Sequence, residues 1–156
     1  MVKSKSTAIA AILASMVLGG CTTGRIDTTE TTSISPVTAD ISEADLVAGK
    51  NQFRQANYGL AEKHFRKAVE LRADNSEAWM GLAASYDQLG RFDFADRAYD
   101  QLLKVAGRKP EIVNNMGYSQ LLRGNKKKAR QLLDEARSAM PGSVVVEANL
   151  ALLKKA

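Results

Sequence analysis

The sequence predicts an all-α protein, a solenoid of three helix-turn-helix repeats closed by one further C-terminal helix. Apolar residues recur at helical spacing in short segments, which are separated by turns rich in Gly, Asn and Pro. Small residues recur 34 positions apart, as Gly90 does with Gly124 and Ala61 with Ala95. One spacing fits three successive segments without an internal gap. A repeat array needs this regularity, because each unit buries its apolar face only against its neighbours.

Residues 77–102 carry the pattern most completely. The residues at its regular offsets are Trp79, Leu82, Ala83, Tyr86, Gly90, Ala95 and Tyr99. Ala83 and Ala95 have almost no side chain, so two helices can approach closely there. The segment resembles a tetratricopeptide repeat, whose signature is W-x2-L-G-x2-Y followed by A-x3-F over 34 residues. It departs from the family at Ala83, where Gly is preferred, and at Leu102, where Ala is preferred, but both substitutes are small or apolar.

The repeat spacing divides the chain into units. We expect repeats at about 42–75, 76–109 and 110–143, within a domain of residues 42–156 that ends in a capping helix at 143–155. Ser42 is expected to cap the first helix through its hydroxyl, and Asn75 lies in the turn that caps the third. The run Val144–Val146 favours a strand by propensity, but the 34-residue spacing predicts a helix there.

Residues 1–20 look like a bacterial export signal. A short basic region precedes about 12 mostly apolar residues, which is the length of a signal-peptide core and short for a membrane span. The segment ends in Leu18-Gly19-Gly20-Cys21, which resembles a lipobox. Cys21 is the only cysteine, and its thiol is placed to accept a lipid as a thioether. The alternative is an unmodified thiol after a plain secretory signal.

Residues 21–41 predict a flexible tether behind the lipidated cysteine. Thr and Ser dominate and no apolar period is sustained, so the segment buries too little apolar area to offset its ordering entropy. A two-stranded ribbon is the alternative. The lipoprotein resemblance implies a permanent membrane anchor. Thr22 follows the cysteine, where an aspartate commonly marks inner-membrane retention, and this favours the periplasmic face of the outer membrane in a two-membrane bacterium.

Composition argues against two classes of function. The formal charge of +5 falls to +3 without the signal segment, and no basic stripe with interleaved aromatics predicts nucleic-acid binding. The cluster Lys126–Lys128 with Arg130 is expected to be a solvated helix face, with an acidic partner or anionic headgroups as the second interpretation. His64, the only histidine, is expected to be exposed, and the carboxylates of Asp93, Asp96 and Asp100 to be salt-bridged. We therefore expect a non-enzyme without cofactor or metal.

The first helix of each repeat should line a concave groove that takes a peptide or a partner helix. The expected groove residues are Lys50, Phe53, Arg54, Met80, Ala84, Asp87, Asn114, Tyr118 and Leu121. Apolar members would anchor the partner, and polar members would orient it. The alternative is that these side chains only pack between helices. The set departs from the lysine-and-asparagine carboxylate clamp of some family members, because the second repeat offers no basic groove residue.

Two stretches have a more particular resemblance. RFDFADRAYDQLLK at 91–104 and NNMGYSQLLRGNKKKARQLLDEA at 114–136, together with the lipobox, resemble the TadD-like lipoproteins of tight-adherence (Flp-type) pilus systems. This resemblance implies an assembly scaffold, such as a pilotin that helps a secretin reach the outer membrane. The alternatives are a periplasmic adaptor for envelope biogenesis or cell-wall enzymes, and a docking subunit of another secretion or pilus apparatus.

Overall fold

A computed structural model describes residues 40–156, and this part of the chain is entirely helical apart from its turns. The helices are α1 (Glu43–Arg54), α2 (Tyr58–Leu71), α3 (Ser76–Gln88), α4 (Phe92–Ala106), α5 (Pro110–Leu122), α6 (Lys126–Ala139) and α7 (Val144–Lys155). The structure confirms the predicted fold class, including a helix rather than a strand at the valine run. None of the helices in residues 40–156 is long and apolar enough to cross a membrane. The predicted signal segment, Cys21 and the predicted tether up to residue 39 lie outside the described residues.

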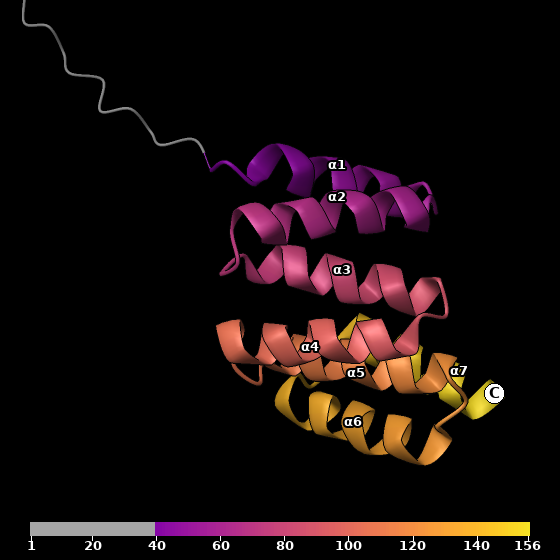
Figure 1. Ribbon diagram of the computed structural model, residues 1–156. Helices are drawn as coiled ribbons and strands as arrows, with labels where there is room; N and C mark the ends of the chain where they lie inside the picture. The colour runs from indigo at the N-terminus through magenta and orange to yellow at the C-terminus, as the bar shows by residue number, and fades with distance from the viewer. Residues whose placement is uncertain (1–39) are drawn as a thin grey trace, which may run out of the picture. The chain divides into compact units, whose positions relative to one another are not determined.

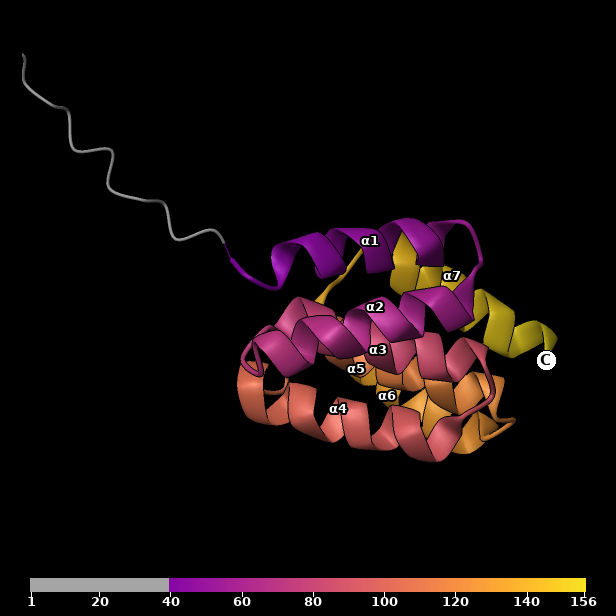
Figure 2. The same cartoon turned by 45° about the horizontal axis from the view of Figure 1, so that its top comes forward.

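The helices form a stack of antiparallel pairs (Figure 1). Each helix packs on the next, and the first helices of successive pairs also contact one another, α1 with α3 and α3 with α5. Within the described residues, α2 does not contact α4, and α4 does not contact α6. The α1–α3–α5 side is therefore the inner side of the stack. Helix α7 packs on α6 and α5 and extends this inner row, as the turned view shows (Figure 2).

Small residues allow the helices to approach closely. Ala61, Ala83, Ala95 and Ala129 are fully buried, which agrees with their repeated spacing in the sequence. The ring of Phe65 fills the space that glycine leaves in both neighbouring helices, at Gly49 of α1 and Gly81 of α3. Two apolar cores result, one through the first five helices and one through α5, α6 and α7. The seven helices alone supply the buried residues of these two cores, so residues 40–156 contain a hydrophobic core on which to fold.

The turns inside the three helix pairs share one backbone conformation, in which a residue with positive φ follows the first helix. Gly90 and Gly124 follow their helices with φ values of 67° and 78°. The amide of the next residue donates back to the helix, as Arg91 does to the carbonyl of Tyr86 at 2.9 Å. In the first pair the same position is Ala56, with φ of 58°. A non-glycine residue is strained in this left-handed region.

One predicted helix cap is wrong and another is confirmed. The Ser42 hydroxyl caps nothing: it is buried, donates to Asp40 Oδ1 at 2.7 Å and accepts from Asn75 Nδ2 at 2.9 Å. Ser42 has this role because α3 of the next repeat brings Asn75 against it. Asn75 does cap α3, since its Oδ1 accepts from the Ala78 amide at 3.0 Å.

Candidate peptide-binding groove

Two hollows lie on the inner row of helices. The first has a volume of about 310 Å³ and is lined by Lys50, Phe53, Arg54, Phe65, Met80, Gly81 and Ala84. The second has a volume of about 380 Å³ and is lined by Phe53, Ala84, Asp87, Gln88, Tyr99, Asn115, Tyr118, Val145 and Asn149. Phe53 and Ala84 belong to both linings. The two hollows therefore form one continuous surface across α1, α3, α5 and α7, which we call the groove.

Seven of the nine expected groove residues line these hollows. They are Lys50, Phe53, Arg54, Met80, Ala84, Asp87 and Tyr118. Phe53 is held by an edge-on contact with Tyr58, with ring centroids 5.2 Å apart. Met80 Sδ lies 2.8 Å from Asn115 Nδ2, so these two side chains join repeats two and three at the surface. The apolar anchors of the groove thus come mainly from the first two repeats.

Asn114 and Leu121 line neither hollow. Asn114 is only 4% exposed, and its Oδ1 accepts a hydrogen bond from Asn149 Nδ2 of α7 at 2.9 Å. Leu121 packs against the second core. The expectation that Asn114 offers a free polar group is wrong, because α7 covers this part of α5. Asn115, one residue further along the helix, lines the groove instead.

Asp87 lines the groove floor but does not offer a free carboxylate. It is 4% exposed and accepts hydrogen bonds from the Tyr99 hydroxyl at 2.9 Å and the Ser119 hydroxyl at 2.6 Å. Arg123 lies 3.8 Å from it. Burial raises the pKa of Asp87, although both hydroxyls and the arginine oppose that shift. Burial, followed by the charge of Asp87, also raises the pKa of Tyr99. Asp87 therefore joins the second repeat to the third.

The exposed charged residues that line the groove are basic and lie at the α1 end. Lys50 Nζ is 2.5 Å from Glu77 at the start of α3, and both side chains are well exposed. Arg54 is exposed and contacts Asn51 of its own helix. The opposite end offers the amides of Gln88, Asn115 and Asn149. Amides both donate and accept, so this end suits the backbone of a bound peptide.

His64 and Asp96 each pair with a charged side chain from outside their own helix. His64 is half-buried rather than exposed as expected, and its Nδ1 lies 3.0 Å from Asp45 Oδ1. A hydrogen bond from Lys67, followed by one from His64, lowers the pKa of Asp45. Asp96 pairs with Arg123 at 2.9 Å. Residues 40–156 contain no group of three His, Cys, Asp or Glu side chains placed to hold a metal ion.

A third hollow, of about 380 Å³, lies between α2 and α4 on the outer side. Trp79 and Tyr86 line it together with the exposed Phe94, whose ring is 5.3 Å from that of Tyr86. Arg97 lies over the Phe94 ring, with its guanidinium carbon 4.4 Å from the ring centroid. The aromatic residues Trp79 and Tyr86 of the repeat signature thus border the outer surface.

Sequence reasoning missed the groove residues that come from second helices or from α7. Phe65 of α2 lines the first hollow beside Gly81 of α3, and Tyr99 of α4 lines the second. Val145 and Asn149 belong to the helix that was expected to act only as a cap. The 34-residue spacing could have indicated Asn149, because this residue stands in α7 at the position that Asn115 holds in α5.

Comparisons with known proteins identify the class. Models of the tetratricopeptide repeat match residues 52–114 and 85–144. Cytochrome c-type biogenesis protein CycH of Pseudomonas aeruginosa is 28% identical over 112 residues, which are 70% of this chain and 28% of CycH. The chain thus spans little more than a quarter of that relative. The helical stack is a tetratricopeptide-repeat solenoid, a fold typical of protein-interaction scaffolds.

Solved structures agree with this assignment. The structure of Pseudomonas aeruginosa pilF matches with a TM-score of 0.61 and 25% identity, over 73% of this chain and 52% of that chain. The Yersinia enterocolitica type III secretion chaperone SycD, in complex with a peptide of the translocator YopD, matches with a TM-score of 0.61 and 20% identity. That match covers 77% of this chain and 97% of SycD.

Proposed function

We propose that this chain is a non-enzymatic, lipid-anchored adaptor that holds a peptide or a helix of a partner protein in the groove. One observation carries the proposal: two connected hollows combine apolar anchors with amides across four helices. Phe53 and Met80 offer apolar surface, and the methionine adapts its shape to different side chains. The partly exposed amides of Gln88 and Asn115 can bond a peptide backbone. This combination suits recognition of a short segment.

The anchor completes the proposed function. Lipidation of Cys21 would hold the groove at a membrane surface, for which we propose the periplasmic face of the outer membrane. The tether of residues 21–41 would then set how far the groove reaches. These statements rest on the sequence of the first 41 residues.

Pilus assembly is the system we favour. The resemblance to TadD-like lipoproteins supports an assembly factor or pilotin-like role in a Tad/Flp-type pilus secretion system, with a secretin as the partner. The likeness to Pseudomonas aeruginosa pilF is consistent with it. SycD is solved with a peptide of a translocator, which shows that this fold can hold a peptide in that protein.

A second candidate is an adaptor in envelope biogenesis or cell-wall enzyme recruitment. The similarity to CycH, which is named a cytochrome c-type biogenesis protein, favours it. Both candidates use the groove in the same way and differ in the partner. The test therefore has to identify the partner.

Site-specific photo-crosslinking in cells tests the proposal. A photoreactive amino acid placed at Met80 or at Tyr118 should capture the partner, and mass spectrometry should identify a secretin or another pilus component. The matched control position is Gln131, which is exposed on α6 and lines neither hollow. Capture of only cell-wall synthases or cytochrome-maturation proteins would replace the pilus role with the adaptor role.

A blocking variant tests the groove itself. Ala84 lies where the two hollows join, so Ala84→Arg should fill the groove and abolish crosslinking from Tyr118. Gln131→Arg adds the same side chain outside the groove and should leave capture unchanged. Circular dichroism should show the same helical content in both variants. Undiminished capture by a folded Ala84→Arg protein would refute binding in the groove.

A further inference from the structure

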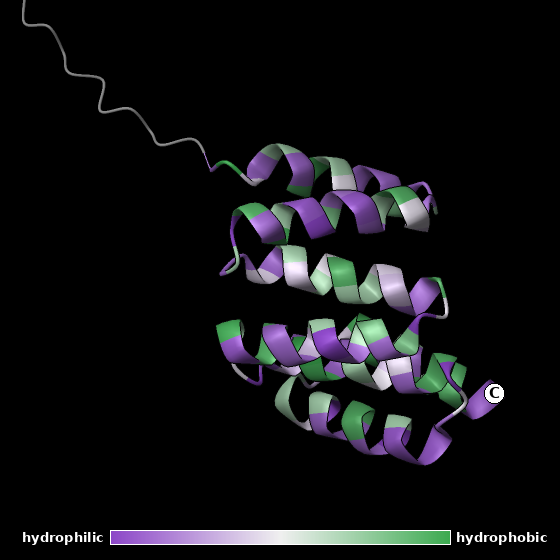
Figure 3. Cartoon of the chain, viewed as in Figure 1, coloured by the Kyte–Doolittle hydropathy of each residue, from purple (hydrophilic) through white to green (hydrophobic). Residues whose placement is uncertain are grey.

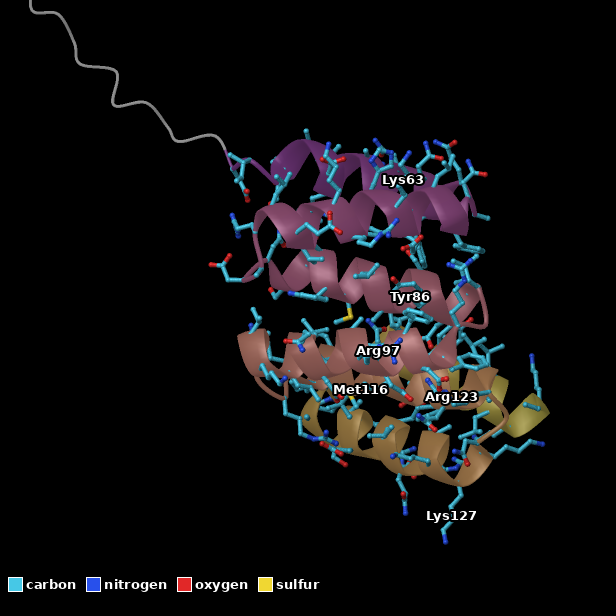
Figure 4. All side chains as sticks on the ribbon, in the orientation of Figure 1. Lys63, Tyr86, Arg97, Met116, Arg123 and Lys127 are labelled. Carbon is cyan, nitrogen blue, oxygen red and sulfur yellow. The ribbon has the colours of Figure 1, made fainter. Side chains whose placement is uncertain are left out.

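Six cations gather at one end of the α6–α7 pair. Lys126, Lys127, Lys128 and Arg130 begin α6, and Lys154 and Lys155 end α7. The two helices pack against each other, and Lys126 Nζ contacts the carbonyl oxygen of Ala156, so segments about 30 residues apart in sequence meet here. We call these six residues the basic end. Figure 3 shows the hydrophilic start of α6 and end of α7, and Lys127 projects away from the body of the protein in Figure 4.

The basic end carries the whole positive surplus of the described residues. Residues 40–156 contain 19 Lys and Arg against 15 Asp and Glu. Without the basic end, 13 cations face the same 15 carboxylates, and the remaining domain is net negative. The surplus is therefore concentrated on one surface instead of being spread over a mixed one, and such a surface attracts anions over the distance of the Debye length.

Within the described residues no Asp or Glu side chain neutralises this charge, and only Lys126 contacts a main-chain oxygen, that of Ala156. All six side chains are exposed, and none of the ion pairs in residues 40–156 includes any of them. The three lysines occupy the first turn of α6, which has no acidic residue, and the helix dipole disfavours cations at that end. Their placement thus opposes the stability of the helix and is not explained by contacts within the domain.

Two exposed leucines lie close to these cations in sequence. Leu122 ends α5 four residues before Lys126 and is 39% exposed, and Leu152 of α7 is 48% exposed two residues before Lys154. The basic end lines none of the hollows described above, so no pocket there would select a particular peptide side chain. Basic residues mixed with exposed apolar ones, without a pocket, are typical of surfaces that lie on anionic lipid.

We propose that the basic end binds the surface of a membrane that contains anionic phospholipids. The lysines and Arg130 contact the headgroups, and the two leucines enter the interface. None of these residues lines the groove, so membrane contact leaves the groove lining free for a partner. The proposal goes beyond the proposed function and depends neither on lipidation of Cys21 nor on the identity of the groove partner.

Vesicle sedimentation with residues 40–156 tests the proposal without the lipid anchor. The vesicles contain phosphatidylethanolamine with or without about one quarter phosphatidylglycerol, at an ionic strength of about 0.1 M. Wild-type protein should sediment with the anionic vesicles and not with the neutral ones. Each lysine near an anionic surface accounts for about fivefold in affinity, so Lys127→Glu/Lys128→Glu/Lys154→Glu should weaken binding by about 100-fold or more.

A matched triple variant distinguishes the effect of the basic end from the effect of net charge on binding. Lys63→Glu/Lys104→Glu/Lys109→Glu makes the same charge change at exposed lysines elsewhere and should change binding by less than about fivefold. Leu122→Ser/Leu152→Ser should weaken the binding that persists at about 0.5 M salt, where charge is screened. Circular dichroism confirms that each variant is folded.

Three results would overturn the proposal. The first is wild-type protein that fails to sediment with anionic vesicles or sediments equally with neutral ones. The second is an equal loss of binding in the two triple variants. The third is binding to a glutamate-rich peptide in solution without binding to the anionic vesicles, which would assign the basic end to an acidic protein.

Discussion

Replacing Gly81 by alanine tests the packing that forms the groove floor. A Cβ atom at Gly81 would lie 2.4 Å from Cε1 and Cζ of the Phe65 ring, well inside contact distance. Phe65 is 3% exposed, and its ring is also close to Gly49, where a Cβ would lie 2.8 Å away. Either the ring, which borders the first hollow, or helix α3 must therefore shift.

Two opposing effects determine how much Gly81→Ala changes the free energy of unfolding. Alanine is favoured over glycine inside a helix by about 0.5–1 kcal/mol. Overpacking of a well-filled core costs about 1–3 kcal/mol. We expect the clash to win, so Gly81→Ala should lower the free energy of unfolding by about 1–2 kcal/mol. The groove floor should change at the same time, since both residues line the first hollow.

Urea unfolding of residues 40–156, followed by circular dichroism, provides the measurement. Gly59→Ala is the matched control, because Gly59 is also helical but no atom lies within 4 Å of its added Cβ. This variant should be as stable as wild type or more stable. Phe65→Leu should reduce the cost of Gly81→Ala, with a coupling of about 1 kcal/mol between the two changes. A Gly81→Ala protein as stable as wild type, or strictly additive effects, would refute the packing argument.

Two further predictions concern the inter-repeat bond and the first turn. Asp87→Ala leaves the Tyr99 and Ser119 hydroxyls buried without their acceptor, so it should cost about 2–4 kcal/mol by urea unfolding at neutral pH, whereas Asp87→Asn should cost less. Burial raises the pKa of Asp87 in the folded protein above its ordinary value of 3.8. The free energy of unfolding of wild type should therefore fall, relative to that of Asp87→Asn, as the pH rises from 3.8 through the folded-state pKa. A difference between the two proteins that does not change with pH would contradict this. Ala56→Gly should raise the melting temperature by relieving about 1 kcal/mol of strain at a φ of 58°, whereas Gly90→Ala should lower it.

The order and type of all seven helices could be predicted from the sequence because each signal is local. Each repeat marks its own close approaches with residues such as Ala61 and Ala95, which are fully buried. The turn positions 56, 90 and 124 also follow from the spacing, and all three have positive φ. Most of the groove followed as well, since helical phase alone decides which residues of α1 and α3 face inward.

The polar residues that were misplaced all depend on a neighbouring repeat. Ser42 accepts from Asn75, 33 residues later, and Asn114 accepts from Asn149, 35 residues later. Asp87 accepts from Ser119 at a separation of 32 residues. Helical periodicity places such a residue on the inner side of its own helix. It does not show whether the first helix of the following repeat will cover that residue. Asn114 and Asp87 were therefore expected to face a partner, although the next repeat buries them both.

These bonds have a consequence for the groove. They run along the inner row, from α1 to α3, from α3 to α5 and from α5 to α7, so each first helix is tied to the next by buried polar groups. A displaced neighbour would leave those groups unpaired, which is costly inside a core. The row is therefore held at a defined curvature before any partner arrives. Binding to such a preformed surface loses less conformational entropy than binding to a flexible one. Helix α7 belongs to this row, since Asn149 both ties it to α5 and lines the groove.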